Sequence, residues 1–201
     1  MENETLILKM NTNLNIVNWE NNNSVNISCS ILKKGGIIVY PTDTLYGMGC
    51  DATNEEAIKK INSIKKRKTP ISVIANSTSM VSNWIKNQKN KKHILQKVST
   101  SNTVIVPIKK NIVSNLILGE NNSLGIRIPN HKFCTKLTNQ YPNPITTTSV
   151  NRTGEKPLTN PNLIKKYFKN EIEIIIEDGI INKKASKIYI FKQNKFILIR
   201  P

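Results

Sequence analysis

The stretch GGIIVYPTDTLYGMGCDA, residues 35–52, decides how this chain is interpreted. Its apolar run at 37–40 is typical of a strand buried on both faces. The next ten residues bring a proline, two threonines, an aspartate, a tyrosine and two glycines, which is more polarity and backbone freedom than a strand-to-helix turn requires. The hydroxyls could serve a small polar ligand or could satisfy the turn locally, and this stretch alone does not separate the two interpretations.

The charge balance is strongly basic. The 201 residues include 30 lysines and arginines against 13 aspartates and glutamates, a formal net charge of +17. Such an excess favours anionic partners such as nucleotides, phosphate esters or tRNA. A solvated surface with a biased composition would show the same excess, because the lysines are spread along the chain.

The cysteines and histidines do not suggest a metal site. Cys29, Cys50 and Cys134 are odd in number and lie far apart, which favours neither disulfides nor a zinc site and fits the cytoplasmic location that we expect. His93 and His131 are isolated, so no metal ligands are predicted. No apolar run has the length of a membrane span and the amino-terminal residues lack a signal-peptide profile, so no membrane association is expected.

Strand and helix patterns alternate along the chain. Strands are predicted over residues 5–9, 37–40, 71–75, 103–108, 124–129, 144–149 and 172–179, and a closing hairpin over 187–200. Helices are predicted over 24–34, 54–66, 78–86, 91–98, 111–118, 131–140 and 160–170, and a loop over 11–23. This alternation, with a terminal hairpin, predicts one α/β domain with a mixed parallel and antiparallel sheet.

Three further polar segments lie where predicted elements end. Four cations at 65–68 follow a helix, either as a solvated last turn or as a phosphate clamp. Arg127 stands alone in an apolar strand, so it either pairs with an acidic residue or binds an anion in a cleft, and the scarcity of acidic residues favours the cleft. The run TTTSVNRTG at 146–154 offers Ser149 and Asn151 as partners for phosphate oxygens, or forms an ordinary turn.

Taken together, these segments resemble the YrdC-like family of threonylcarbamoyl-adenylate synthases. PTDTLYGMGCDA at 41–52 is similar to the family's PT[ED]TxYGLGx[DN]A signature. Lys65-x-Arg67 resembles its KxR motif, GIRIPNH at 125–131 its VRxPxH strand, and SVN at 149–151 its SxN motif. The order and approximate spacing of the four motifs make the combination specific.

The resemblance implies a twisted sheet with flanking helices around a basic central cavity. It also implies the reaction of L-threonine, bicarbonate and ATP, normally with Mg²⁺, to threonylcarbamoyl-adenylate and pyrophosphate. The product would pass to a downstream threonylcarbamoyl transferase that modifies tRNA beside the anticodon. Because these substrates are anionic, cations and oriented donors gathered in one cavity suit the chemistry.

The site residues follow from the same resemblance. The threonine-binding residues would be Thr42, Thr44, Tyr46, Arg127, Thr147 and Ser186. The ATP-binding residues would be Lys65, Arg67, Thr69, Ser123, Ser149, Asn151 and Arg200. The catalytic residues would be Lys65, Arg67, Ser149 and Asn151.

Two departures from the family pattern bear on these roles. Only Lys68 and Thr69 separate Arg67 from the next proline, where the family usually has a longer loop that covers the site. The chain ends one residue after Arg200, so the resemblance implies a short form with a single domain at 1–201 and its core at about 24–200.

Two other functions stay open on the same fold. One is an RNA-binding module for tRNA or double-stranded RNA, which the charge would favour. The other is a carbamoyl-transfer paralogue, because a fold does not fix a substrate. Retention of Lys65, Arg67, Ser149 and Asn151 favours the synthase.

Overall fold

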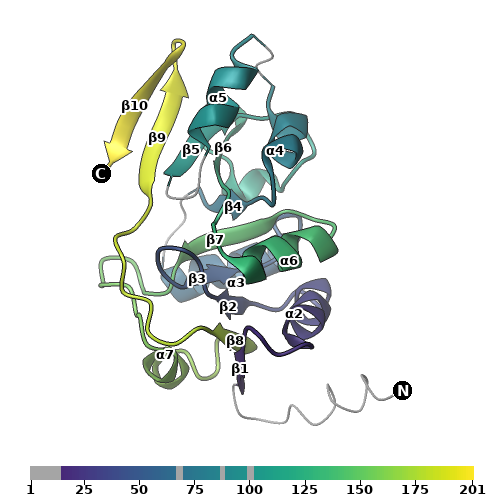
Figure 1. Ribbon diagram of the computed structural model, residues 1–201, viewed down its shortest axis with the longest axis vertical. Coiled ribbons are helices and arrows are strands. Elements are labelled where there is room, and N and C mark those ends of the chain that lie inside the picture. The colour runs from purple at the N-terminus through teal and green to yellow at the C-terminus, as the bar shows by residue number, and fades with distance from the viewer. Residues whose placement is uncertain (1–14, 67–69, 87–88, 99–101) are drawn as a thin grey trace.

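One ten-stranded sheet runs through this computed structural model, which describes residues 15–66, 70–86, 89–98 and 102–201 (Figure 1). The strands are β1 (Asn15–Asn18), β2 (Ile38–Tyr40), β3 (Gly47–Gly49), β4 (Ser72–Ile74), β5 (Asn102–Pro107), β6 (Ser123–Arg127), β7 (Ile145–Ser149), β8 (Ile174–Glu177), β9 (Lys187–Lys192) and β10 (Lys195–Arg200). Their order is β1-β8-β2-β3-β7-β4-β6-β5-β9-β10. Strand β4 pairs parallel with β6 and antiparallel with β7, so the predicted mixed α/β sheet is confirmed.

Helices cover both faces of the sheet. They are α2 (Ser24–Lys33), α3 (Glu55–Lys65), α4 (Thr78–Trp84), α5 (Lys91–Lys97), α6 (Lys132–Gln140) and α7 (Pro161–Tyr167). Helices α2 and α6 lie side by side and share one apolar cluster with the sheet (Figure 1). Side chains of α3, α4, α5 and α7 belong to the larger cluster. None of the described helices is long and apolar enough to cross a membrane.

The predicted two-sided strand at 37–40 is confirmed. Ile38 and Tyr40 belong to the cluster shared with α2 and α6, whereas Ile37 and Val39 belong to the larger cluster. All four side chains are buried. Successive residues of a strand point to opposite faces, so a strand in the middle of a covered sheet needs apolar residues at every position.

The loop after β2 returns as a strand rather than leading into a helix. Strand β3 pairs antiparallel with β2, with Tyr40 opposite Gly47 and Ile38 opposite Gly49. A Cβ on Gly49 would lie 2.2 Å from the carbonyl oxygen of Thr146, and one on Gly47 would lie 3.0 Å from the Tyr40 ring. These glycines therefore allow close approach, and neither has a positive φ. The turn contains residues 41–46, which include both predicted threonines.

Two element predictions are wrong, and one lies outside the described residues. The predicted loop at 11–23 contains β1, which pairs in parallel with β8. The polar residues of β1 do not form the apolar pattern from which a strand is predicted. The predicted helix at 111–118 is only a 3₁₀ turn, Asn115–Ile117, capped by the Ser114 hydroxyl. Asn111 has a φ of 62°, which an α-helix cannot accommodate. The predicted strand at 5–9 lies outside the described residues.

Candidate functional site

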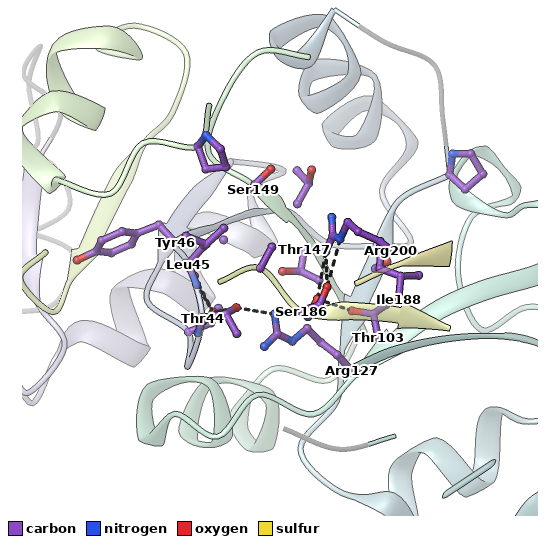
Figure 2. Close-up of a pocket in the computed structure, with 17 residues that line it drawn as sticks. Thr44, Leu45, Tyr46, Thr103, Arg127, Thr147, Ser149, Ser186, Ile188 and Arg200 are labelled. Carbon is purple, nitrogen blue, oxygen red and sulfur yellow. Dashed lines mark hydrogen bonds between the residues drawn. The ribbon is translucent and has the colours of Figure 1, made fainter. Parts of the chain in front are cut away.

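A cavity of about 260 Å³ opens where strand ends from both halves of the sheet converge (Figure 2). All six predicted threonine-binding residues line it, as do two predicted ATP-binding residues. Together these are Thr42, Thr44, Tyr46, Arg127, Thr147, Ser186, Ser149 and Arg200. Arg127 and Ser149, which are predicted to hold different substrates, thus share one hollow. Among the described lining residues two side chains are cationic and none is anionic.

Arg127 ends β6 and is 6 % exposed. Its Nη1 donates to Thr44 Oγ1 at 3.0 Å, and its Nη2 donates to Asp43 Oδ1 at 2.7 Å. The pairing with an acidic residue is therefore observed, and Arg127 also lines a cavity, where anion binding stays a prediction. Burial raises the pKa of the Asp43 carboxyl above its usual value, although the positive charge of Arg127 lowers it.

The two threonines of the β2–β3 turn differ in their contacts. Thr42 Oγ1 donates to the Leu45 carbonyl at 2.6 Å and accepts from the N–H groups of Thr44 and Leu45 at 3.2 and 3.3 Å. The Thr42 hydroxyl thus bonds backbone groups of its own turn, which is one of the two interpretations that the sequence left open. Thr44 instead points its hydroxyl toward Arg127 (Figure 2). Of this pair, Thr44 has the hydroxyl that a ligand at Arg127 would meet.

Tyr46 lines the cavity, but its hydroxyl contacts the turn after β8. The hydroxyl donates to the Gly179 carbonyl at 2.7 Å and accepts from the Asp178 N–H at 2.8 Å. Figure 2 shows the ring directed away from Arg127. Burial raises the pKa of Tyr46 to about 12, against the lowering effect of the Asp178 N–H. The neutral hydroxyl therefore fastens the β2–β3 turn to the chain beyond β8.

The threonines of β7 divide between a structural role and the cavity lining. Thr146 Oγ1 accepts the Cys50 N–H at 2.8 Å and is fully buried beside β3. Thr147, one residue on, lies opposite Ser72 across the β4–β7 pair, and both line the cavity. Polar residues begin inside the strand because its last three residues, Thr147, Thr148 and Ser149, all border the hollow, whereas Thr146 secures β3.

The second cationic residue of the cavity, Arg200, belongs to the closing hairpin. Arg200 donates through Nη2 to the Ser186 carbonyl at 2.8 Å, and Ser186 Oγ lies 3.0 Å from Thr103 Oγ1 (Figure 2). Burial, together with the like charge of Arg127, lowers the pKa of the Arg200 guanidinium. Arginine remains protonated under physiological conditions even so, which gives the cavity a second fixed cation.

The predicted catalytic group at Lys65 is assembled behind Ser149. Lys65 is 2 % exposed, so it is not part of a solvated last turn. Its Nζ donates to the Ser149 carbonyl at 2.5 Å and to Asn151 Oδ1 at 3.0 Å. Ser149 Oγ donates to the same amide oxygen at 2.6 Å. Lys65 and Asn151 are therefore one step behind the cavity lining, which Ser149 reaches directly.

Asn151 uses its whole amide within this group. Its Oδ1 receives two donors, and its Nδ2 donates to the carbonyls of Arg152 and Glu155 at 2.8 and 2.7 Å. An amide with all its bonds made inside the protein organises the loop after β7.

Ser123 lies in a neighbouring cavity of about 530 Å³. This second hollow shares Pro70, Ser72 and Ile188 with the first, and its other lining residues are largely apolar. The predicted ATP-binding residues thus divide between a polar cavity at Arg200 and an apolar one at Ser123. Two further predicted residues, Arg67 and Thr69, lie outside the described residues.

Four polar side chains of this site were not among the predicted residues: Asp43, Ser72, Thr103 and Thr148. Asp43 anchors Arg127 although the low acidic content counted against such a partner. Its position between the two threonines of the turn was the available signal. Thr103, which contacts Ser186, lies in an apolar strand and was given no role.

Comparison with known proteins gives one family. The family model described as "Telomere recombination", for Sua5, YciO and YrdC, matches residues 30–201. A "Threonylcarbamoyl-AMP synthase" of Photobacterium profundum is 30% identical over 154 residues, which are 74% of this chain and 83% of that protein. One from Coxiella burnetii is 28% identical over 158 residues, 77% of this chain and 84% of that protein.

Solved structures agree with these sequence relatives. The crystal structure of P. abyssi Sua5 complexed with L-threonine has a TM-score of 0.81 and 25% identity. It matches over 93% of this chain but only 57% of that longer protein. E. coli YciO has a TM-score of 0.80 at 22% identity, covering 88% of this chain and 87% of that one, which shows the shared fold. The chain therefore belongs to the Sua5/YciO/YrdC family.

Proposed function

We propose that this protein is a threonylcarbamoyl-AMP synthase. It would join L-threonine, bicarbonate and ATP into threonylcarbamoyl-adenylate and release pyrophosphate. The observation that carries the proposal is one hollow that joins the Arg127–Thr44 pair to Ser149, behind which Lys65 is held. The names of the bacterial relatives and the threonine complex of P. abyssi Sua5 support the same activity.

Threonine would bind with its carboxylate at Arg127. A guanidinium that is already fixed by Thr44 and Asp43 does not have to be ordered when the ligand arrives. Asp43 offsets part of its charge, so the hydroxyls of Thr44, Thr147 and Ser186 would supply the remaining hydrogen bonds. Carbamate formation on the threonine amine would add a second anion, which Lys65 and Arg67 would face.

ATP would lie across both cavities. Its phosphates would meet Ser149, with the Lys65 ammonium one step behind it and with Arg67 and Thr69 in the chain that follows α3. Arg200 and Ser123 would contact the nucleoside, whose base suits the apolar cavity. This arrangement works by positioning and electrostatics and needs no covalent nucleophile.

Mg²⁺ would enter with the nucleotide, where it would neutralise phosphate charge. The described lining of the first cavity offers hydroxyl and guanidinium groups but no carboxylate, and Glu120 is the one acidic residue in the described lining of the second. No group of three metal-ligating side chains is found among the described residues. The cation would therefore be held by phosphate oxygens and water, and we assign it no protein ligand.

The wider setting belongs to the proposal as well. The product would be passed in the cytoplasm to a threonylcarbamoyl transferase that modifies tRNA, and the protein could bind tRNA itself through its net charge of +17. A non-catalytic RNA-binding module is not favoured by the named relatives, and carbamoyl transfer is supported only by fold likeness.

The test is pyrophosphate release with substrates omitted one at a time. Release should require ATP, L-threonine and bicarbonate together, and Arg127→Gln should abolish it. Lys132→Gln, which removes an exposed cation of α6, is the matched control and should leave release unchanged. Release that ignores threonine, or that needs carbamoyl phosphate in place of bicarbonate, would contradict the proposal.

A further inference from the structure

Lys65 is held at both ends by the segment that follows β7. Its ammonium group donates to the Ser149 carbonyl and to Asn151 Oδ1. Its backbone carbonyl accepts from Thr153 twice, from the hydroxyl at 2.7 Å and from the N–H at 3.1 Å. The side chain and the backbone of one residue are thus fixed by a span of five residues, 149–153.

Arg152, inside the same span, binds the last turn of α3 at the residue before Lys65. Its Nη1 donates to the Ile64 carbonyl at 2.6 Å, and its Nη2 donates to Glu171 Oε1 at 2.6 Å. Its guanidinium lies 5.7 and 5.5 Å from the ring centroids of Tyr167 and Phe168. Arg152 therefore ties the end of α3 to α7 and to the chain that leads into β8.

These contacts give hydrogen-bond donors and a positive charge to the carbonyl end of α3. The last carbonyls of a helix lack partners within it and carry its negative end. Here that end lies beside Lys65, where the phosphates of ATP are proposed to bind. The donors of Thr153 satisfy one of these carbonyls, and the cation of Arg152 covers another. Lys66 then leaves the helix with a φ of 53°, so the chain turns away at this point.

We propose that Arg152 and Thr153 are positioning residues for nucleotide binding, an inference that rests on the proposed function. They fix the end of α3, so that the Lys65 ammonium is held at Ser149 before ATP arrives. Threonine is proposed to bind at Arg127, whose guanidinium donates to Thr44 and Asp43 of the β2–β3 turn, whereas Arg152 and Thr153 fix the end of α3. Their loss should therefore weaken ATP binding and leave threonine binding intact.

Thr153→Val tests the hydroxyl, and Thr153→Ser is its conservative partner. Thr153 is exposed, so neither change disturbs the core. The KM for ATP in pyrophosphate release should rise about fivefold in the valine variant and stay near wild type in the serine variant. The KM for threonine should be unchanged in both. Thr135→Val, at an exposed position of α6, controls for the substitution itself and should match wild type.

Arg152→Met and Arg152→Lys form the second pair. Methionine keeps the apolar contact with the two rings but removes both donors, and should raise the KM for ATP about tenfold. Lysine keeps the charge without the planar fork and should fall between methionine and wild type. An unchanged KM for ATP in both valine and methionine variants overturns the proposal, as does an equal rise for both substrates.

Calorimetric binding of pyrophosphate separates this inference from the proposed function. If wild type releases no pyrophosphate from the complete mixture, the proposed function fails. Wild type and Thr153→Ser should still bind pyrophosphate alike, and Thr153→Val about fivefold more weakly. Equal binding by all three proteins, or no binding by wild type, overturns the positioning role.

Discussion

At the scale of single residues, Arg127 shows what a sequence can and cannot reveal. A lone arginine between apolar residues predicts either an anion or a carboxylate partner, because an unpaired buried charge is costly. Composition alone pointed to the cleft, whereas the structure shows a carboxylate partner and a position in the lining of a cavity. The pairing with Asp43 could not be derived because 84 residues separate the two positions.

Arg127→Lys is the residue-scale prediction for activity. A lysine cannot donate to Thr44 and Asp43 and also present a planar fork to a carboxylate. The substitution should lose charge-assisted hydrogen bonds to the threonine carboxylate that contribute about 1.5–3 kcal/mol to binding. The KM for threonine should therefore be roughly 10- to 100-fold higher than in wild type. The KM for ATP should change less than threefold. Steady-state kinetics with each substrate varied check this, and a wild-type KM for threonine would show that the carboxylate binds elsewhere.

Asp51→Asn is the residue-scale prediction for stability. The carboxylate of Asp51 accepts from Tyr141, Asn143 and Thr53, each at 2.7 Å, and is buried. Burial raises the pKa of Asp51, but these hydrogen bonds outweigh it and leave the pKa below its usual value. At pH 7 the variant should lose about 1.5–3 kcal/mol of unfolding free energy.

The pH dependence of that loss has a definite sign. A pKa lowered by folding stabilises the protein above the unfolded pKa of about 3.9, and this stability disappears as the pH falls through the folded value. Urea unfolding of wild type and Asp51→Asn should therefore differ most at neutral pH and converge in acid. A constant difference from pH 7 to about pH 3 would mean that the charge of Asp51 is not what the donors recognise.

At the scale of elements, strands with apolar runs were predictable and the exceptions have physical causes. Strand β3 is two glycines around a methionine, and it forms because its backbone pairs with β2 and β7, with the glycines leaving room for Tyr40 and β7. Strand β1 is framed by asparagines and is half-buried at the edge of the sheet, so its pairing with β8 replaces the missing apolar pattern. Both strands depend on partners that are remote in sequence.

The closing hairpin gives an element-scale prediction. The ring of Phe196 in β10 packs against the rings of His93 and Phe191, with centroids at 4.9 and 5.0 Å, and that of Tyr189 is 6.5 Å away. These contacts fasten β10, which carries Arg200, to α5. Phe196→Ala should cost about 1–2 kcal/mol through the lost aromatic pairs, and should open the hairpin before the rest of the sheet.

Hydrogen exchange of residues 195–200 measures that opening. Protection there should fall in Phe196→Ala while protection of β2 and β8 stays at the wild-type level. Leu198→Ala, at a 45% exposed position of the same strand, is the matched control and should cost less than about 0.5 kcal/mol. Uniform loss of protection across the sheet would show that the hairpin is not a separate unit.

At the scale of the whole molecule, the site is built from segments that only the folded sheet brings together. Its lining comes from the β2–β3 turn, from β4, β5, β6 and β7, and from both sides of the closing hairpin. Local patterns predicted the polar strand ends, but not that they share one hollow. The family resemblance supplied that grouping, because motif order carries information about contacts that composition and periodicity lack.

The last prediction concerns the charge of the whole chain. With 30 cationic and 13 acidic side chains, repulsion among like charges should destabilise the folded state at low ionic strength. The described residues form three ion pairs between lysine or arginine and a carboxylate, so salt has few attractions to screen and many repulsions. Raising sodium chloride from about 20 to 300 mM, which shortens the Debye length to below about 10 Å, should therefore raise the Tm by several degrees. Differential scanning calorimetry checks this, with an uncharged osmolyte at matched osmolality as the control for excluded-volume effects. A Tm that stays flat or falls would mean that the lysines are too far apart to repel one another, and that the charge excess has no effect on the fold.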